Sequence, residues 1–438
     1  MKNTKLIVIN LFLFVLLILS PLIVLLWVPL PPARDYWIEF SVALGYSGIA
    51  IMGFQLFLTA RIKWINRLWG EYVVYQMHKS LSVIALIMII AHPVILFIIN
   101  PERIALLNIF TAPWRARFAS ISTYSLIALI LLALLRNKLN IKYEIWHYTH
   151  LILAFLAIAG GLAHVFAWGY YLESPVKNGL WLILVMMWCV ILLYTRVLRP
   201  IVSLKKPYKV TSKKNQRGDC TTLVMHPVNH SGFTFLPGQY GLLTAFRHPF
   251  SLTSHPFSFS SSADVDDGRI EMTIKQCGDF TKRIRDISPG DKVFIDGPHG
   301  GYQMTESTDV HVFIAGGIGI TPIISIIRTL ADRNDKRPVI LFYGFRDWAS
   351  CTFKEELISL ANVINMKLVF IIEKLDEDGA TEYGVINRVI LERHLPQAPK
   401  DHKYFICGPD SMIPIVEKML SAMSVPIENY HSEKYSFS

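Results

Sequence analysis

Two stretches of this chain begin and end in histidine at the same spacing: HKSLSVIALIMIIAH at residues 78–92 and HLILAFLAIAGGLAH at residues 150–164. A separation of 14 residues is about 3.9 turns of an α-helix, so both histidines of a stretch return to nearly the same face, about 21 Å apart along the axis. Polar groups inside apolar spans are costly and usually functional. Two such helices side by side would stack two imidazole pairs, one near each membrane surface.

Each predicted imidazole pair suits a haem that takes one histidine on either side of its iron. His78 with His150 and His92 with His164 would hold two b-type haems. The alternative is four separate histidines, each hydrogen-bonded to a nearby backbone carbonyl, but identical spacing in two spans favours the haems. His147 is a rival ligand one turn before His150, yet only His150 has a partner 14 residues away in its own span.

The first 200 residues consist mostly of long apolar runs, several of them near the length that a bilayer requires. The six predicted spans are Leu6–Val28, Ile38–Leu58, Gln76–Ile99, Ala119–Leu135, His147–Tyr170 and Gly179–Leu198. The first run is longer than the apolar part of a typical signal peptide and no small-residue cleavage site follows it. We therefore interpret it as a membrane span.

Basic residues gather between spans two and three, between spans four and five, and after span six. They are Arg61, Lys63, Arg67, Arg136, Lys138, Lys142, Arg196, Arg199, Lys205 and Lys206. The positive-inside bias then places both termini in the cytoplasm of a multi-pass protein of the cell membrane. Spans three and five run in parallel, so His78 and His150 lie near the cytoplasm, and His92 and His164 near the exterior.

The loop between spans three and four disagrees with this bias, because Arg103, Arg115 and Arg117 would lie outside. Arg115 or Arg117 either neutralises haem propionates at the outer surface or anchors the loop at the interface. The net charge of +10 does not indicate nucleic-acid binding, since no basic-aromatic array accompanies it. The five cysteines are scattered without a C-x-x-C motif, so neither a zinc site nor an iron–sulfur cluster is indicated.

From about Lys205 the composition becomes that of a soluble α/β protein. Residues 205–303 alternate short strands with turn signals, as in a small antiparallel β-barrel. Residues 309–438 begin with an apolar strand that runs into GGIGITP at 316–322 and a helical pattern. Glycines let backbone amides approach a pyrophosphate, and a helix N-terminus favours its charge. Thr321 suits the N-cap of that helix and Pro322 its first position.

Five features occur in a recognisable order. They are the two histidine pairs, HPFSFSS at 255–261, GDFT at 278–281, GGIGITP at 316–322 and CGPDSM at 407–412. Together they resemble the ferredoxin–NADP reductase superfamily fused to a ferric-reductase-like membrane domain, the combination found in NADPH oxidases and ferric reductases. Over about residues 40–438 the chain looks most like the bacterial NADPH oxidases. The resemblance implies a multidomain fold: a six-helix transmembrane bundle with two b-type haems (1–200), an antiparallel β-barrel FAD domain (205–303) and an α/β NAD(P)H-binding domain (309–438).

The resemblance also assigns the flavin site. The residues expected closest to the flavin ring and ribityl chain are His255, Pro256, Phe257 and Ser258. The residues expected to hold the FAD phosphates are Lys275, Gly278, Asp279, Phe280 and Thr281. The letters HPFS also occur at 248–251, but the family places its motif about sixteen residues after the glutamine of PGQ, which favours the second copy. Phe437, with Tyr435 as the rival, would cover the flavin until the nicotinamide displaces it, and Glu433 would lie nearby. The alternative for this tail is a frayed terminus.

The nucleotide site combines the glycine-rich turn with the CGPDSM motif. The residues expected at the pyrophosphate are Gly316, Gly317, Ile318, Gly319, Thr321 and Pro322. The CGPDSM motif adds Cys407, Gly408 and Pro409. The resemblance places Cys407 beside the nicotinamide. Arg346 follows the predicted strand Val339–Tyr343, where an Arg can accompany the 2′-phosphate of NADPH. Asp347 comes directly after it, so an exposed surface charge is the alternative for Arg346.

The expected chemistry follows from the cofactors. A nicotinamide gives up a hydride and a haem accepts one electron, so FAD would act between NADPH and the inner haem. The expected acceptor is O2, giving superoxide, because two histidines keep O2 from either iron and the predicted external loops contain only Asp35, Glu102 and Glu173 as carboxylates and no His or Cys. That is too sparse for a dedicated ferric site, but a soluble ferric chelate remains the alternative acceptor.

Other classes of protein explain less of the chain. A haem-only carrier leaves residues 205–438 without a purpose, and a tethered flavin reductase leaves the paired histidines unexplained. A transporter would show intramembrane carboxylates or broken helices. The expected partners are therefore the lipid bilayer, NADPH and the acceptor, without nucleic acid and without a required protein partner.

Overall fold

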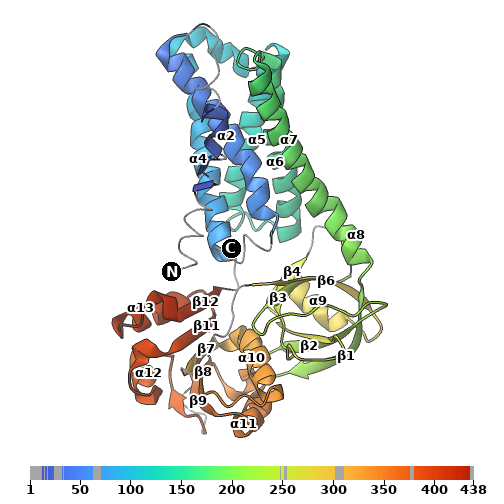
Figure 1. The fold of residues 1–438 in the computed structure, drawn as a ribbon, viewed down its shortest axis with the longest axis vertical. Coiled ribbons are helices and arrows are strands. Elements are labelled where there is room, and N and C mark those ends of the chain that lie inside the picture. Colours follow the sequence, from blue (N-terminus) through green and yellow to red (C-terminus); the bar gives the residue numbers. More distant parts are fainter. Residues whose placement is uncertain are drawn as a thin grey trace. The chain divides into compact units, whose positions relative to one another are not determined.

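The computed structural model describes residues 34–62, 71–246, 248–250, 254–300, 310–374 and 379–434, together with positions 12, 13, 15, 16, 18–23 and 32. The chain divides into two compact units, Met1–Pro200 and Ile201–Ser438. The first is helical and the second contains both sheets (Figure 1).

The first unit is built from long apolar helices. They are α2 (Tyr36–Thr59), α4 (Glu71–Ile99), α5 (Trp114–Leu135), α6 (Tyr143–Trp168) and α7 (Pro175–Leu193), with α7 continuing through the π-helical turn η2 (Tyr194–Leu198) into α8 (Arg199–Leu204). Among the described residues five helices are long and apolar enough to cross a membrane. They correspond to the last five predicted spans. The first predicted span, Leu6–Val28, lies mostly outside the described residues.

Local signals explain where several of these helices begin and end. The Asp35 carboxylate caps α2 by accepting a hydrogen bond from the Trp37 backbone N–H at 2.9 Å. Gly169 ends α6 in the left-handed conformation at φ +70°, which glycine adopts without strain. Pro175 opens α7, where its missing N–H costs no helical bond. Large apolar side chains such as Ile87 and Leu134 are exposed, as expected for surfaces that face lipid.

Small residues let these helices pack in two close pairs, α2 with α4 and α5 with α6. A Cβ atom on Gly160 of α6 would lie 2.9 Å from the Phe118 carbonyl oxygen of α5, so glycine permits the backbones to approach. Ser122 of α5 donates a 2.6 Å hydrogen bond to the Ala157 carbonyl of α6. The histidine-bearing helices α4 and α6 therefore pack mainly against α2 and α5, with few close backbone contacts between themselves.

The second unit begins with six antiparallel strands. They are β1 (Tyr208–Gln216), β2 (Cys220–Pro227), β3 (Tyr240–Thr244), β4 (His255–Ser258), β5 (Ile270–Lys275) and β6 (Lys292–His299), in the order β4-β3-β6-β1-β2-β5. An isolated bridge between Phe259 and Met272 joins the two edges, so the strands form a ring. Leu223, Phe259 and Met272 fill its interior. The short helix α9 (Asp279–Arg283) follows β5.

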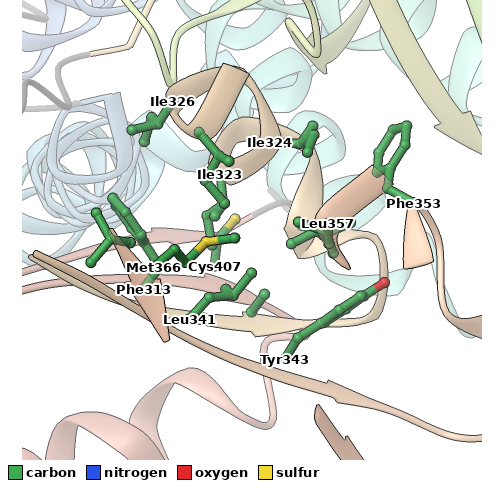
Figure 2. Close-up of a cluster of buried hydrophobic side chains, with 14 of the residues drawn as sticks. Phe313, Ile323, Ile324, Ile326, Leu341, Tyr343, Phe353, Leu357, Met366 and Cys407 are labelled. Atoms are coloured by element: carbon green, nitrogen blue, oxygen red, sulfur yellow. The ribbon is translucent and has the colours of Figure 1, made fainter. Parts of the chain in front are cut away.

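The second sheet is parallel and has helices on both faces. Its elements are β7 (His311–Gly316), α10 (Ile320–Asp332), β8 (Val339–Phe345), α11 (Lys354–Val363), β9 (Met366–Ile372), β10 (Glu382–Tyr383), α12 (Arg388–His394), β11 (Lys403–Gly408), α13 (Ile413–Ala422) and β12 (Tyr430–Lys434), and the strand order is β10-β9-β8-β7-β11-β12. Its central strands are buried because both faces are covered. Phe313 and Leu341 pack against Ile323 of α10 and Leu357 of α11 (Figure 2).

The predicted α/β nucleotide-binding fold agrees with this parallel sheet. The predicted boundary between the two soluble domains falls in residues 301–309, outside the described residues. The division of the second unit at 303 and 309 therefore stays a prediction.

Candidate functional site

The four histidines of the two apolar stretches lie in two pairs. The imidazole of His78 on α4 faces that of His150 on α6, with ring centroids 6.4 Å apart and planes at 53°. His92 and His164 repeat the arrangement at 6.5 Å and 55°. The structure thus brings together the histidines that the spacing and topology of the spans place at the same level.

The separation of the rings fits a metal held between them. A metal–imidazole nitrogen bond is about 2.0 Å, so two imidazoles on opposite sides of one metal place their ring centroids roughly 6 Å apart. No described cluster of three or more His, Cys, Asp or Glu side chains would hold a bare metal ion. Two protein ligands per site suit a metal whose other ligand positions are filled by a macrocycle. Such a macrocycle needs space between the two helices, and α4 and α6 make few close contacts with each other.

Three of the four histidines have their Nδ1 atoms engaged by oxygen acceptors. The Nδ1–H of His78 donates to Gln55 Oε1 at 2.7 Å. The Nδ1–H of His92 donates to the Ser41 carbonyl at 2.9 Å, and that of His164 donates to the Arg115 carbonyl at 2.7 Å. A proton fixed on Nδ1 leaves the Nε2 lone pair for a metal, and such partners also orient the ring. The Nδ1 of His150 is buried and has no hydrogen-bond partner in the described part of the chain.

The acceptors Gln55 and Ser41 were not identified from the sequence. Both belong to α2, a helix without a histidine pair, and they reach the histidines only because α2 packs along α4. Their signal is visible in retrospect: polar side chains inside a predicted apolar span are costly unless they have a partner.

The other residues near the pairs fall into clear positions. His147, the rival ligand, contacts the rings of Tyr143 and Trp146, at 5.6 and 6.4 Å between centroids, whereas the ring opposite His78 is that of His150. The Arg117 guanidinium donates to the Ala112 and Phe110 carbonyls, which suits an anchor of its own loop. The Arg115 guanidinium lies 4.5 Å from the ring centroid of Trp168.

The segment expected along the flavin is an edge strand. Residues 255–258 form β4, which pairs with β3 on one side only, with Leu243 opposite His255 and Tyr240 opposite Ser258. The outer side of an edge strand presents backbone N–H and C=O groups that a ligand can pair with. The first HPFS copy differs, because residues 249 and 250 lie in a turn and Ser251 is outside the described residues.

The segment expected at the FAD phosphates lies beside β4. Lys275 ends β5, and the Thr281 hydroxyl accepts hydrogen bonds from the backbone N–H groups of Cys277 and Gly278, at 2.9 and 2.8 Å. Phe280 stacks on the His255 ring with centroids 3.8 Å apart. The two flavin segments of the sequence are therefore adjacent in space.

The glycine-rich turn and the CGPDSM motif meet at the carboxyl ends of neighbouring parallel strands. β7 and β11 pair with Ala315 opposite Cys407. A Cβ atom on Gly319 would lie 2.1 Å from the Cys407 carbonyl oxygen, and one on Gly316 would lie 2.7 Å from Met412 Sδ. Gly317 has φ +52° and faces open space. Ligands bind at this end of such sheets.

The predicted N-cap at Thr321 is wrong. The turn Gly317–Gly319 closes as a 3-10 turn, η4, and runs directly into α10, so the N-cap is Gly319 and the helix begins at Ile320. Thr321 and Pro322 lie inside the first turn, where the Thr321 hydroxyl donates to the Ile318 carbonyl at 2.6 Å.

Arg346 is exposed directly after β8, and its neighbour Asp347 is already engaged. The Asp347 carboxylate accepts a hydrogen bond from the Ser350 backbone N–H and lies 3.0 Å from Lys374 Nζ. The hydrogen bond from Lys374 is the main reason that the pKa of Asp347 is lowered. The Asp347 carboxylate is therefore engaged by Ser350 of its own loop and by Lys374, which follows β9.

The expected nicotinamide residues are partly described. Cys407 is fully buried, and β11 pairs with β12 so that Glu433 lies opposite it. Glu433 also lies near Gly300, the residue after β6: a Cβ atom added to Gly300 would be 3.6 Å from Glu433 Oε1. Phe437 and Tyr435, the two candidates for the flavin cover, lie outside the described residues.

Comparison with protein families gives three matches along the chain. Residues 44–161 match the ferric reductase like transmembrane component, residues 207–316 an FAD-binding domain, and residues 313–418 an oxidoreductase NAD-binding domain. The chain thus joins a ferric-reductase-like membrane domain to a flavin- and nucleotide-binding reductase module. This is the NADPH oxidase/ferric reductase-like architecture, which confirms the resemblance inferred from the motifs.

Individual proteins are similar to part of the chain. The reductase component of propane 2-monooxygenase from Rhodococcus jostii is 27% identical over 52% of this chain and 63% of its own length. NADH-cytochrome b5 reductase 1 from Candida glabrata is 30% identical over 36% of this chain and 58% of its own length. The chain thus spans less than two thirds of these relatives.

A solved structure of flavohemoglobin from Malassezia yamatoensis, with bound FAD and heme, is similar with a TM-score of 0.51 and 16% identity. That match covers 92% of this chain and 99% of the other. At this level of identity the similarity concerns the fold alone.

Proposed function

We propose that this protein is a membrane oxidoreductase that takes electrons from cytoplasmic NADPH and delivers them to an acceptor on the opposite side, with FAD and two b-type haems as cofactors. The observation that carries the proposal is the presence of two facing histidine pairs, 6.4 and 6.5 Å between ring centroids, in a chain that also has FAD- and NAD-binding domains. In this proposal the protein lies in the cell membrane with both termini in the cytoplasm.

The four histidines would hold the haems, and their surroundings would set how strongly they do so. When bound, FAD accepts a hydride from the nicotinamide and releases single electrons, and haems carry those electrons one at a time. Gln55, Ser41 and Arg115 supply the oxygens that hold the proton on Nδ1, so Nε2 would remain available to bind the metal. Two histidines holding each iron would leave no ligand position for O2, so its reduction would be outer-sphere.

The residues of the second unit would place the flavin and the nucleotide. The outer side of β4 and the segment from Lys275 to Thr281 would contact FAD, while Gly316–Gly319 would approach the pyrophosphate with backbone N–H groups. Cys407, Gly408 and Pro409 would lie at the nicotinamide. Phe437, with Glu433 nearby, would cover the flavin when no nucleotide is bound.

We propose NADPH as the preferred nucleotide because Arg346 is exposed at the end of β8 and Asp347 is paired with Lys374. Several of the similar proteins are named for NADH, among them NADH-cytochrome b5 reductase 1 and a subunit of a Na(+)-translocating NADH-quinone reductase, so the preference has to be measured with both nucleotides. Equal efficiency with NADH and NADPH in the parent protein would rule it out.

We propose O2 as the acceptor, giving superoxide. Of the three carboxylates in the predicted external loops, Asp35 caps α2, which leaves Glu102 and Glu173 as ferric ligands, too few for a dedicated site. The match to a ferric reductase like transmembrane component supports a soluble ferric chelate as the second candidate.

Two measurements test these proposals. An absorption spectrum of the purified protein should contain flavin together with two low-spin haems per chain; flavin alone, or haem alone, would contradict the complete electron path. NADPH-driven cytochrome c reduction should be suppressed by superoxide dismutase. Dismutase-insensitive activity together with much faster anaerobic reduction of a ferric chelate would assign the protein as a ferric reductase.

A further inference from the structure

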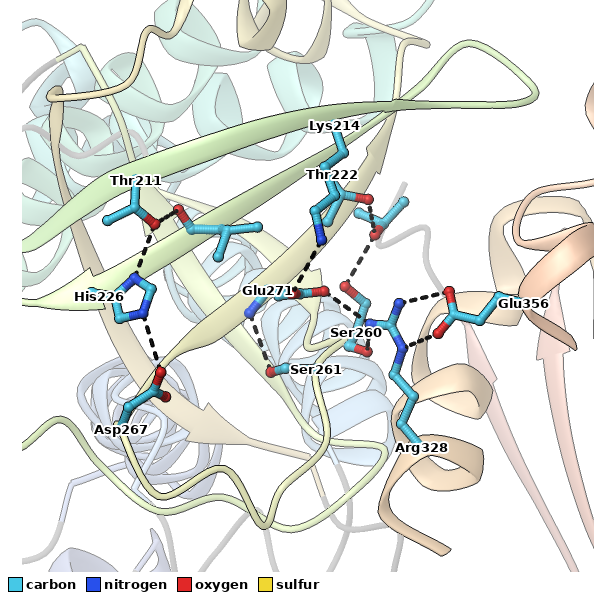
Figure 3. Close-up of polar contacts among 12 residues, drawn as sticks. Thr211, Lys214, Thr222, His226, Ser260, Ser261, Asp267, Glu271, Arg328 and Glu356 are labelled. Carbon is cyan, nitrogen blue, oxygen red and sulfur yellow. Dashed lines mark hydrogen bonds and ion pairs between the residues drawn. The ribbon is translucent and has the colours of Figure 1, made fainter. Parts of the chain in front are cut away.

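A charged network inside the second unit joins the nucleotide-binding helix to the segment that follows the flavin strand. Arg328 of α10 donates from Nη1 to the Ser260 carbonyl (2.6 Å) and to Glu271 Oε2 (2.9 Å). On its other side, Nε and Nη2 donate to the two carboxylate oxygens of Glu356 on α11, at 2.6 and 2.9 Å. Figure 3 shows the guanidinium between these two sets of partners.

The network is withdrawn from water on the Glu271 side, whereas the Glu356 side chain is 36% exposed. The Arg328 side chain is 18% exposed and that of Glu271 is 7% exposed. The planar guanidinium donates hydrogen bonds on both sides, which fixes its orientation. A surface ion pair, by contrast, exchanges its partners with water. A polar network of this kind also specifies one relative position of the elements it joins, because its bonds are directional.

Neighbouring residues of α10 bind the same segment. Ser325 donates to the Ser261 carbonyl at 2.7 Å, and the Thr329 hydroxyl accepts from the Ala263 backbone N–H at 2.9 Å. Positions 325, 328 and 329 lie on one helix face, since residues three and four apart are neighbours. One side of α10 is therefore fixed to residues 260–263 by hydrogen bonds.

Both ends of this connection are close to the proposed cofactor sites. Ser260 comes two residues after Ser258 of the flavin strand, and Arg328 lies nine residues after Gly319 on the helix that begins at the glycine-rich turn. Since α10 is a continuous helix, a shift at Arg328 is passed to the turn that would hold the nucleotide. Hydride transfer is sensitive to such a shift, because a misplacement of about 1 Å can cost about 100-fold in rate.

We propose that Arg328 is a positioning residue that sets the distance between the nicotinamide and the flavin. The proposal rests on the proposed function, and it adds a residue outside the segments expected to contact the cofactors. Replacement of Arg328 should slow hydride transfer while leaving nucleotide affinity almost unchanged, because the glycine turn would shift together with α10 and keep its own shape.

The test is anaerobic, stopped-flow reduction of the flavin by saturating NADPH in the full-length protein. Arg328→Met should lower the limiting rate about 10- to 100-fold, with the KM for NADPH changed less than about threefold. Arg328→Lys is the second variant, since it keeps the charge and is the safer of the two to fold. Its single ammonium cannot replace a fork that serves two partners, so its limiting rate should still fall at least about fivefold.

A matched control lies at the C-cap of the same helix. Arg333 makes a bidentate pair with Asp264 at 2.5 and 2.7 Å, but its side chain is 49% exposed. Arg333→Met should change the limiting rate less than about twofold, because exposed pairs are weak.

Parent-like limiting rates in both Arg328 variants, or an equal loss in Arg333→Met, would overturn the proposal. So would a rate that falls only together with flavin content and melting temperature. A parent flavin that neither NADPH nor NADH reduces would instead refute the proposed function.

Discussion

The two units of this protein build their candidate sites from different parts of the chain. In the membrane unit the site consists of side chains: four histidines, each 14 residues from its counterpart on the same helix. In the second unit the backbone does most of the placing, through the edge of β4 and the turn Gly316–Gly319. Removal of one ligand side chain should abolish cofactor binding at a site made of side chains. A site made of backbone should lose binding when a larger residue fills the space that a glycine leaves open. Other substitutions there should change its affinity only gradually.

The largest expected effect is in the membrane unit. His92→Leu should remove one of the two haems and abolish delivery of electrons to the outer acceptor, because no other described side chain faces His164 as a ligand. Reduction of the flavin by NADPH should continue. The measurements are haem content by absorption and anaerobic flavin reduction; His147→Leu is the control and should keep both haems. If all four single histidine replacements retain two low-spin haems, the ligand assignment is wrong.

The next effect tests the backbone site. Gly319→Ala would place a Cβ atom 2.1 Å from the Cys407 carbonyl oxygen, and such overpacking against backbone typically costs about 1–3 kcal/mol. We expect a lower melting temperature and a higher KM for NADPH. Gly278→Ala is the control for stability, since its Cβ would meet only Thr281 Oγ1, at 3.9 Å. Equal melting temperatures for the two variants would show that the close approach is not required.

A smaller effect, on the KM for NADPH, is expected when one side chain at the nucleotide site is replaced. Arg346→Ala should raise the KM for NADPH about tenfold, which corresponds to about 1.4 kcal/mol, the order of one hydrogen bond to a charged group. The KM for NADH should change little, so the second nucleotide serves as the internal control. A parallel rise in both values would mean that Arg346 supports the loop and does not select the 2′-phosphate.

The smallest effect distinguishes the two histidine pairs from each other. Gln55→Leu removes the acceptor of the His78 Nδ1–H, which makes the imidazole a weaker donor. The midpoint potential of the inner haem should therefore rise, by roughly 59 mV for each tenfold change in the relative affinity for the two oxidation states. Ser41→Ala is the comparison variant, because it removes the hydroxyl 2.9 Å from His92 Nδ1 but keeps the Ser41 backbone carbonyl that accepts the Nδ1–H. Potentiometric titration that finds both variants unchanged would remove Gln55 from the site.

The sequence predicted the membrane helices well where apolar length decides them. The helices α4 and α5 end at the predicted residues Ile99 and Leu135, but they begin earlier, at Glu71 and Trp114. Polar residues continue a helix beyond the apolar run, and hydropathy alone does not detect this. The histidine pairs were predictable because spacing and topology are both properties of the sequence.

The missed features depend on packing between distant segments. Gln55 reaches His78 only through the contact of α2 with α4, and Arg328 meets Glu271, 57 residues away, across the interior of the second unit. The Thr321 cap failed for a local reason, because a 3-10 turn of three residues precedes α10. Pattern reasoning identifies which residues carry chemistry more readily than it identifies their partners.

For the proposed electron path, the 14-residue spacing of the histidines also has an electrical consequence. It separates the two levels by about 21 Å along the helix axis, roughly two thirds of a hydrocarbon core about 30 Å thick. An electron that moves outward between these levels crosses a similar share of the membrane voltage, which is worth about 2.3 kcal/mol per charge and 100 mV. In a cell that is negative inside, each 100 mV would therefore favour the outward step by about 1.5 kcal/mol, and continued turnover would depolarise the membrane unless a compensating ion flow accompanied it.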